Sequence, residues 1–214
     1  MAVICPTVTA TDAHQYSQQM EGIATFVHRV HVDLMDGVLA PTKSPPLDKI
    51  WWPVGVKADL HLMYQKPVEA LDAIIEHQPS LVIIHAEAEG NFVNIAQRLS
   101  RAGIKVGVAL LPKTSAETIQ PSLSLIDHIL IFSGDLGHFG GKADLGLLNK
   151  VKSLKKMKAD LEIGWDGGIN SQNIESLVEG GVDVLNVGGF IQKAQTPRDA
   201  YAKLKSLAEK QRDE

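Results

Sequence analysis

The chain has 214 residues, of which 44% are hydrophobic and 5% aromatic, a composition typical of a globular protein with one sizeable core. Its formal net charge of -4 gives no electrostatic reason to bind nucleic acid or an anionic membrane, so neither is an expected partner. The single cysteine, Cys5, excludes an internal disulfide, and no apolar run approaches the roughly 18 residues that span a bilayer. We therefore expect a cytoplasmic protein with one domain over residues 1–214.

Short apolar runs rich in β-branched residues alternate along the chain with segments of helical periodicity. The runs predict strands at Ala2–Cys5, Val27–Asp33, Val56–His61, Leu81–His85, Lys105–Leu110, His128–Phe132, Leu161–Asp166 and Val184–Val187. The periodic segments predict helices at Ala13–Thr25, Pro67–His77, Phe92–Ala102, Ala116–Leu123, Leu145–Lys158, Gln172–Glu179 and Pro197–Lys210. A Pro-rich connection follows the second predicted strand.

This alternation, without a flexible linker, predicts an α/β protein with a single-domain (β/α)8 TIM barrel. A doubly wound open sheet is the alternative. That fold usually carries Gly-x-Gly-x-x-Gly after its first strand, whereas this chain continues there as Cys5-Pro6-Thr7. The barrel is therefore the favoured architecture.

The second and third predicted strands carry side chains that can bind a metal. Because successive side chains of a strand point to opposite faces, His31 and Asp33 share one face. Asp59 and His61 share a face of the third strand in the same way. Asp166 ends the seventh strand, and the active sites of these barrels form at the C-terminal strand ends. Imidazoles and carboxylates that converge there can hold a divalent cation, which would polarise a carbonyl group and make a neighbouring C–H removable.

Glycine pairs follow three of the later strands, at Gly140-Gly141, Gly167-Gly168 and Gly188-Gly189. Glycine lets backbone N–H groups approach an anion closely, and the loops after strands seven and eight are the usual phosphate site of this fold. A phosphorylated small molecule is therefore the expected ligand. His85, at the end of the fourth strand, has two interpretations, a site residue or a polar group with a structural hydrogen bond.

The motifs at successive strand ends resemble those of the ribulose-phosphate 3-epimerase family. The likeness runs nearly end to end, and its specific part is the combination of His31-Val32-Asp33-Leu34-Met35-Asp36-Gly37 with Asp59-Leu60-His61-Leu62-Met63. Further matches are Cys5-Pro6-Thr7, His85-Ala86-Glu87-Ala88, Phe139-Gly140-Gly141, Asp166-Gly167-Gly168 and Gly188-Gly189.

The resemblance implies that one divalent metal, Zn2+, Fe2+ or Mn2+, is bound by His31, Asp33, His61 and Asp166. It implies that Asp33 and Asp166 are the proton acceptor and donor that interconvert D-ribulose 5-phosphate and D-xylulose 5-phosphate, a step of the pentose phosphate pathway, by inversion at C3. The implied substrate-binding residues are Thr7, Met35, His61, Met63, Phe139, Gly140, Gly141, Gly167, Gly168, Gly188 and Gly189. Related barrels assemble as dimers to hexamers, so a homo-oligomer is expected by analogy.

The chain departs from the family pattern where the sugar phosphate is held. Thr7 stands where serine is usual, although it keeps the hydroxyl. The segment after Gly37 lacks the usual His-Phe-Val-Pro-Asn, the loop after the sixth strand has one extra residue, and Gly189 replaces a serine. Lys142 either adds a positive charge near the phosphate or faces water. Two alternatives therefore stay open: a 3-epimerase of a ketohexose phosphate such as allulose 6-phosphate, and a non-catalytic barrel that binds a sugar phosphate.

Overall fold

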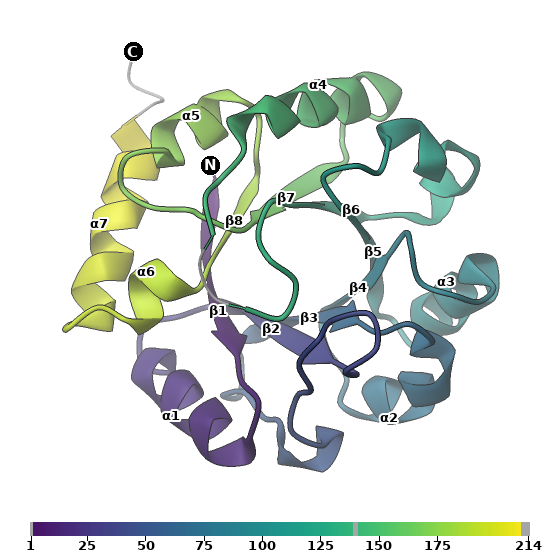
Figure 1. Cartoon of the computed structure of the whole chain (residues 1–214), viewed down its shortest axis with the longest axis horizontal. Coiled ribbons are helices and arrows are strands. Elements are labelled where there is room, and N and C mark those ends of the chain that lie inside the picture. Colours follow the sequence, from purple (N-terminus) through teal and green to yellow (C-terminus); the bar gives the residue numbers. More distant parts are fainter. Residues whose placement is uncertain (1, 139–140, 211–214) are drawn as a thin grey trace.

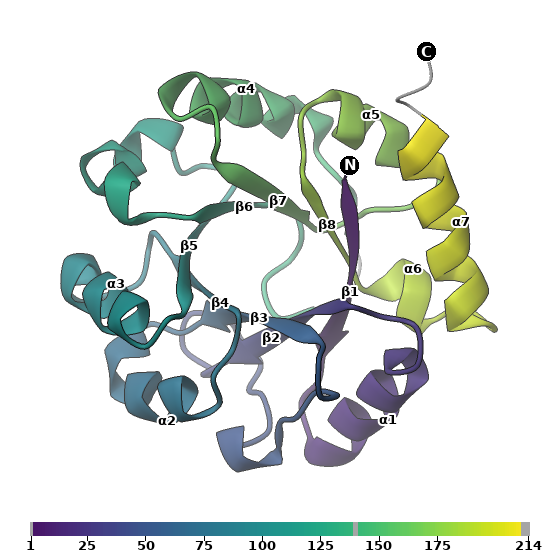
Figure 2. The same cartoon turned by 180° about the vertical axis from the view of Figure 1, so that it is seen from behind.

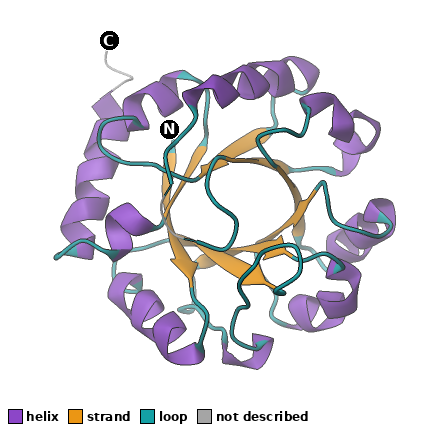
Figure 3. Ribbon diagram, viewed as in Figure 1, coloured by secondary structure: helices purple, strands orange, loops and turns teal. Residues whose placement is uncertain are grey.

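The computed structural model describes residues 2–138 and 141–210, and its strands form one closed parallel barrel in chain order from β1 to β8 (Figure 1). The strands are β1 Val3–Thr9, β2 Arg29–Met35, β3 Lys57–Met63, β4 Leu81–His85, β5 Lys105–Leu110, β6 His128–Phe132, β7 Glu162–Asp166 and β8 Val184–Val187. Helices surround the ring of strands, as the view from behind in Figure 2 and the colouring of Figure 3 show. The predicted (β/α)8 TIM barrel is confirmed, and the open sheet is excluded.

The outer layer combines α-helices with short 3-10 helices. The α-helices are α1 Ala13–Ile23, α2 Leu71–Glu76, α3 Phe92–Arg101, α4 Leu148–Met157, α5 Ile174–Glu179, α6 Gly189–Gln192 and α7 Pro197–Lys210. The 3-10 helices are η1 Leu47–Lys49, η2 Pro67–Ala70, η3 Ala116–Leu125 and η4 Leu145–Leu147. The α-helix expected near 116–123 is replaced by η3, which contains Pro121, a residue that cannot donate the α-helical hydrogen bond. Among the described residues, no helix has both the length and the apolar character that crossing a membrane requires.

Strand β1 is longer than the sequence predicts. Its expected end is Cys5, but the strand continues to Thr9 because residues 7–9 pair with residues 31–33 of β2. Pro6, which suggests a break in the sequence, lies in register with Val187 of β8. The extension matters for the site, since it places Thr9 directly beside Asp33.

Alternation along the strands separates an outer apolar layer from the barrel interior. The outward side chains of β2, Val30, Val32 and Leu34, join the main core between strands and helices. Inside the barrel, a small second cluster consists of Leu81, Ile83, Ala109 and Leu130. At the mouth, a third cluster of Met35, Ala40 and Met63 packs against Leu136 from the loop after β6. Burial of apolar surface thus fixes the strands, and the inward polar residues of β2, β3 and β7 are held between these layers.

Candidate active site

Three strands bring the four predicted metal ligands to one point inside the barrel. Strands β2 and β3 pair in parallel with Asp33 opposite His61, and His31 lies two residues earlier on the same face of β2. Asp166 comes from the end of β7, which is separated from β2 by β8 and β1 in the closed ring. Barrel closure is therefore what places a second carboxylate near the first.

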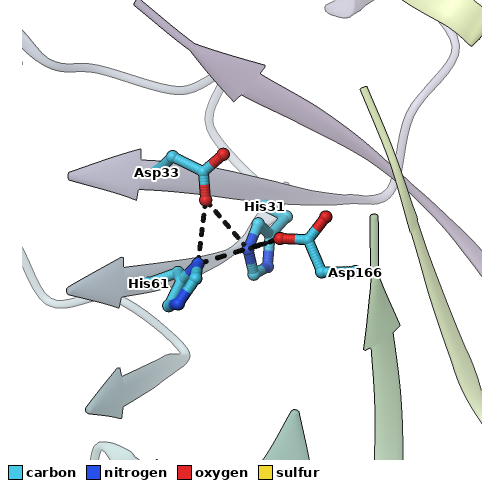
Figure 4. A group of neighbouring side chains, drawn as sticks. All are labelled: His31, Asp33, His61 and Asp166. Atoms are coloured by element: carbon cyan, nitrogen blue, oxygen red, sulfur yellow. Dashed lines mark hydrogen bonds and ion pairs between the residues drawn. The ribbon is translucent and has the colours of Figure 1, made fainter. Parts of the chain in front are cut away.

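The four side chains are buried, and one ligand atom of each lies within 4.8 Å of all the others. Oδ1 of Asp33 is 2.9 Å from Nδ1 of His61 and 3.3 Å from Nε2 of His31. Oδ2 of Asp166 is 3.6 Å from the same nitrogen of His31. Figure 4 shows the two imidazoles and the two carboxylates turned toward a common centre. This spacing is close enough for the four groups to share one ion.

Burial and mutual repulsion split the acidities of the two carboxyl groups. Burial, reinforced by the charge of Asp33, raises the pKa of Asp166 to about 7. Although burial opposes its ionisation too, the adjacent His31 and His61 hold the pKa of Asp33 well below its ordinary range. Burial and the neighbouring His85 lower the pKa of His61 to about 3, so its imidazole is neutral at pH 7. The four residues therefore comprise two carboxyl groups and two imidazoles, without a lysine or arginine among them.

The ring nitrogens of His31 also have unused hydrogen-bonding capacity. His31 is fully buried, and within the described part of the chain neither of its ring nitrogens has a hydrogen-bond partner of proper geometry. Imidazole nitrogens and carboxylate oxygens together are the donor set that Zn2+, Fe2+ or Mn2+ accepts. Although burial opposes protonation, Asp33 and Asp166 raise the pKa of His31, so a metal ion would take the place of that proton. The four residues thus fit a divalent metal, in both charge and ligand type.

Asp59, which shares a strand face with His61, belongs to a different cluster. It lies nearer the start of β3, where its Oδ2 accepts from Nε of Arg29 at 2.7 Å. A period of two residues fixes the face of a strand but not the height at which a side chain finds its partners. The two metal-capable groups of this motif therefore serve opposite ends of the barrel.

A cavity of about 260 Å³ opens on the cluster at the C-terminal mouth of the barrel. Asp33 and Asp166 lie on its wall, together with these predicted substrate-binding residues: Thr7, Met63, Gly141, Gly167, Gly168, Gly188 and Gly189. Met35 and His61 do not line it, although Met35 packs with Met63 in the mouth cluster and Nδ1 of His61 is 2.9 Å from Asp33. Phe139 and Gly140 lie outside the described residues. Lys142 is exposed away from the cavity, whereas Lys193 of the segment after α6 lines it.

Gly167 and Gly168 are required by a close backbone approach. Both have positive φ angles, 109° and 70°. A Cβ on Gly167 would lie 2.3 Å from the backbone nitrogen of Gly134, and one on Gly168 would lie 2.1 Å from that of Ala143. The pair therefore lets the loops after β6 and β7 pack backbone to backbone along the cavity.

Among the polar cavity residues that the sequence analysis misses, two lie beside the carboxylates. The hydroxyl of Thr9 donates to Oδ2 of Asp33 at 2.5 Å, the oxygen that His61 does not contact. Asn186 pairs with Asp166 in register, and its side-chain amide is buried without a partner in the described structure. A signal for Asn186 exists, because it is the polar residue of the apolar strand Val184–Val187. Thr9 has none, since its role depends on the extension of β1.

Comparisons with known proteins agree with this arrangement. The model of the Ribulose-phosphate 3 epimerase family matches residues 3–192. Ribulose-phosphate 3-epimerase of Mycobacterium leprae is 31% identical over 214 residues, covering 96% of this chain and 95% of its own. The protein of the same name from Bacillus subtilis is 26% identical, covering 96% of this chain and 99% of its own. Among solved structures, KGPDC from Streptococcus mutans in complex with a pentose 5-phosphate superposes with a TM-score of 0.69 at 12% identity, covering 98% of each chain, a likeness of fold. Because the family match spans nearly all of the barrel, the chain belongs to the ribulose-phosphate 3-epimerase family and is an isomerase acting on carbohydrates.

Proposed function

We propose that the protein is a metal-dependent epimerase that inverts C3 of a ketose phosphate, with D-ribulose 5-phosphate and D-xylulose 5-phosphate as its substrate pair. One observation carries the proposal: Asp33 and Asp166 reach one cation site from strands that are not neighbours, and both border the cavity. Inversion next to a carbonyl needs one group to remove a proton from one face and another to return a proton to the opposite face. Two carboxylates on separate strands can flank a planar enediolate in this way.

The two carboxyl groups differ in acidity before a metal binds. Although burial opposes ionisation, His31 and His61 hold the pKa of Asp33 low, whereas burial and Asp33 raise the pKa of Asp166 to about 7. A bound dication would lower both pKa values, so the roles rest on the positions of the two groups. We assign Asp33 and Asp166 to these two roles, which exchange when the reaction runs backward. The hydroxyl of Thr9 holds the second oxygen of Asp33 and so orients its carboxylate.

A divalent metal held by His31, Asp33, His61 and Asp166 would polarise the substrate carbonyl and stabilise the developing negative charge. Met63, on the cavity wall, provides a polarizable surface of low polarity that limits water beside the reacting carbon. The glycine loops after β7 and β8 offer backbone N–H groups to the phosphate, and Lys193 adds a positive charge. The pentose phosphate held by the Streptococcus mutans barrel supports a sugar phosphate as the class of ligand.

The departures in the connection after β2 favour a second candidate, a 3-epimerase of a ketohexose phosphate. Ala40 of this connection is fully buried against Met35 and Met63 at the mouth, so the altered segment shapes the entrance directly. The loop after β6 also reaches this segment, because the hydroxyl of Thr42 donates to the carbonyl oxygen of Gly137 at 3.1 Å. A changed entrance would alter how much sugar the cavity accepts.

Isotope exchange tests both candidates. Purified protein loaded with Zn2+, Mn2+ or Fe2+ is incubated in D2O with a panel of ketopentose and ketohexose phosphates, and deuterium at C3 is measured. We expect exchange and epimer formation with ribulose 5-phosphate, dependent on about one bound metal ion per chain. Faster exchange with a ketohexose phosphate would favour the second candidate, and binding without any exchange would favour a non-catalytic barrel. Self-association stays a prediction, which analytical ultracentrifugation measures.

A further inference from the structure

A row of side chains leads from His61 away from the metal site to an acidic residue. Nε2 of His61 lies 2.8 Å from Nε2 of His85, at the end of β4, and Nδ1 of His85 lies 3.3 Å from Oε2 of Glu87. The two rings stack with centroids 4.9 Å apart, and Phe132 packs against both. On its other side, Nδ1 of His61 faces Asp33 at 2.9 Å. The row therefore has a carboxylate at each end and two buried imidazoles between them.

Glu87 is fixed as an acceptor by its other contacts. Its Oε1 accepts from the backbone N–H of Leu111 at 3.4 Å and from the hydroxyl of Thr114. Although burial opposes ionisation, hydrogen bonds from His85 and Thr114 lower the pKa of Glu87. Lys150 holds this loop in place, because its ammonium group donates to the carbonyl oxygens of Leu111 and Thr114 at 2.7 and 2.6 Å. An ionised carboxylate held in this way can only accept hydrogen bonds.

The number of N–H hydrogens in the row decides which nitrogen donates in each contact. The row has three contacts, Asp33 to His61, His61 to His85 and His85 to Glu87. Two neutral imidazoles supply only two N–H hydrogens, because each has one donor and one acceptor nitrogen. If Glu87 accepts from Nδ1–H of His85, then Nε2 of His85 accepts from Nε2–H of His61. The nitrogen of His61 that faces Asp33 then carries a lone pair and no hydrogen. It repels the carboxylate oxygen of Asp33 unless both atoms bind a cation.

From this geometry we propose that Glu87 and His85 are positioning residues for the metal site: they fix the tautomer of His61 so that Nδ1 presents its lone pair to the metal. The inference rests on the metal centre of the proposed function, and it adds a reason why the sequence has His85-x-Glu87 at the end of β4. Hydrogen bonds to the far nitrogen of a metal-binding imidazole are a general means of raising metal affinity. His31 lacks such a partner among the residues described, so the support is specific to His61.

The variant Glu87→Gln separates this role from a merely structural one. The N–H of Leu111 can only donate, so the amide oxygen of the new side chain stays against it and the amide NH2 turns to His85. Donor and acceptor then exchange in every contact of the row, and His61 donates from Nδ1 to Asp33. All three contacts are satisfied without a metal. We therefore expect weaker metal binding in a protein whose metal-free form is at least as stable as before.

Three measurements test the proposal. Competition with a chelator gives the Zn2+ and Co2+ affinities, thermal unfolding gives the stability of the metal-free form, and long-range 1H–15N NMR of the Zn2+-loaded wild-type protein reads which ring nitrogens carry hydrogen. We expect Glu87→Gln to weaken metal binding about 10- to 100-fold. Glu89→Gln, two residues further on, is the matched control, since Glu89 is exposed and contacts the side chain of Gln65 instead. It should change the affinity less than about twofold.

Each result either supports the proposal or overturns it. His85→Leu should weaken metal binding as Glu87→Gln does, and His85→Gln, whose amide oxygen can still accept from His61, should recover part of the affinity. Unchanged affinity in Glu87→Gln, hydrogen on Nδ1 of His61 in the Zn2+-loaded wild type, or a wild type that binds no metal would each overturn the proposal. The NMR reading needs no variant and no substrate. A protein that shows the expected tautomers but no isotope exchange would keep this inference and reject the proposed function.

Discussion

The two ends of the barrel interior contain similar residues with opposite electrostatics. The upper cluster, at the mouth, consists of His31, Asp33, His61 and Asp166. The lower cluster, at the strand starts, consists of Arg29, Asp59, His128 and Glu162. Strand β2 contributes two residues to the upper cluster and one to the lower, and β3 and β7 contribute one residue to each. The two clusters differ in one respect: the lower cluster contains a permanently charged cation, Arg29, and the upper cluster does not.

In the lower cluster the guanidinium group of Arg29 neutralises the acids. It donates to Asp59 at 2.7 Å and to both oxygens of Glu162 at 3.0 and 2.9 Å, and Nδ1 of His128 contacts Glu162 at 2.7 Å. Bidentate pairing of this kind is strong and directional. The four residues of the upper cluster include no counterpart of Arg29, and its two acids face the imidazoles of His31 and His61 instead. Under the proposed function a metal ion neutralises these acids, whereas the lower cluster is neutralised by its own side chains.

The largest effect should follow from removing an acid of the upper cluster. Asp33→Asn or Asp166→Asn should lower turnover by about 10²- to 10⁴-fold, the usual scale for losing a general acid or base. Steady-state kinetics on metal-loaded protein measure this. The matched control is Asp59→Asn in the lower cluster, which should cost stability but leave turnover per folded molecule within a few-fold. Equal losses at both ends would mean that the clusters do not divide their roles.

Removing the built-in cation should have the next largest effect. Arg29→Met leaves Asp59 without its ion-pair partner and Glu162 with His128 alone, and breaking a buried pair such as Arg29–Asp59 costs about 3–5 kcal/mol. Urea unfolding measures the loss, with Lys57→Met as control, an exposed lysine opposite Arg29 in the strand register. The control should stay within about 0.5 kcal/mol. A small change in Arg29→Met would contradict the structural role of this end.

Binding of a divalent metal at the upper cluster should stabilise the protein against unfolding. A metal at one hundred times its dissociation constant adds about 2.7 kcal/mol to the free energy of unfolding. Thermal unfolding of wild-type protein with Zn2+ or with a chelator should therefore differ by about 5–10 °C. The difference should shrink in Asp166→Asn, which lacks one ligand, and persist in Asp59→Asn. Equal shifts in both variants would indicate a metal site elsewhere.

The fold and the clustering of the four candidate ligand residues could be predicted because they depend on local patterns. The apolar runs predict the eight strands of the barrel, and β4, β5, β6 and β8 have the bounds that the runs indicate. The four candidate ligand residues belong to short motifs at strand ends, where alternation fixes the face of each side chain. Residues that depend on register were not predictable. Thr9 lies beside Asp33 only because β1 continues past Pro6, and Asp59 meets Arg29 through its height along β3.

One acid of each cluster, Glu162 of the lower and Asp166 of the upper, should respond to pH with opposite sign. Although burial opposes its ionisation, His128 and Arg29 hold the pKa of Glu162 far below the ordinary 4.5. Its stabilising contribution is therefore present above about pH 4.5 and is lost as the pH falls toward the lower value of the folded state. Burial and Asp33 instead raise the pKa of Asp166 to about 7, so ionising it destabilises the metal-free protein as the pH rises from about 4 to 7.

Thermal unfolding of metal-free protein between pH 3 and pH 8 tests this difference in sign. Glu162→Gln should be less stable than wild type at pH 7, and the gap should close below about pH 4.5. Asp166→Asn should gain stability relative to wild type as the pH rises toward 8. The same pH dependence for both variants would remove the contrast between Glu162 and Asp166.

The smallest effect tests how tightly the upper end is arranged. The hydroxyl of Thr9 contacts the oxygen of Asp33 that His61 leaves free, at 2.5 Å. Thr9→Val keeps the shape but removes the donor, and a hydrogen bond to a charged group is worth about 1.5 kcal/mol, or roughly tenfold in rate. Thr9→Ser should restore turnover, because the hydroxyl returns. Thr11→Val, which changes an exposed hydroxyl in the following loop, should leave it unchanged. If Thr9→Val turns over as fast as wild type, then the metal and the imidazoles alone orient Asp33, and the extension of β1 serves the barrel rather than the chemistry.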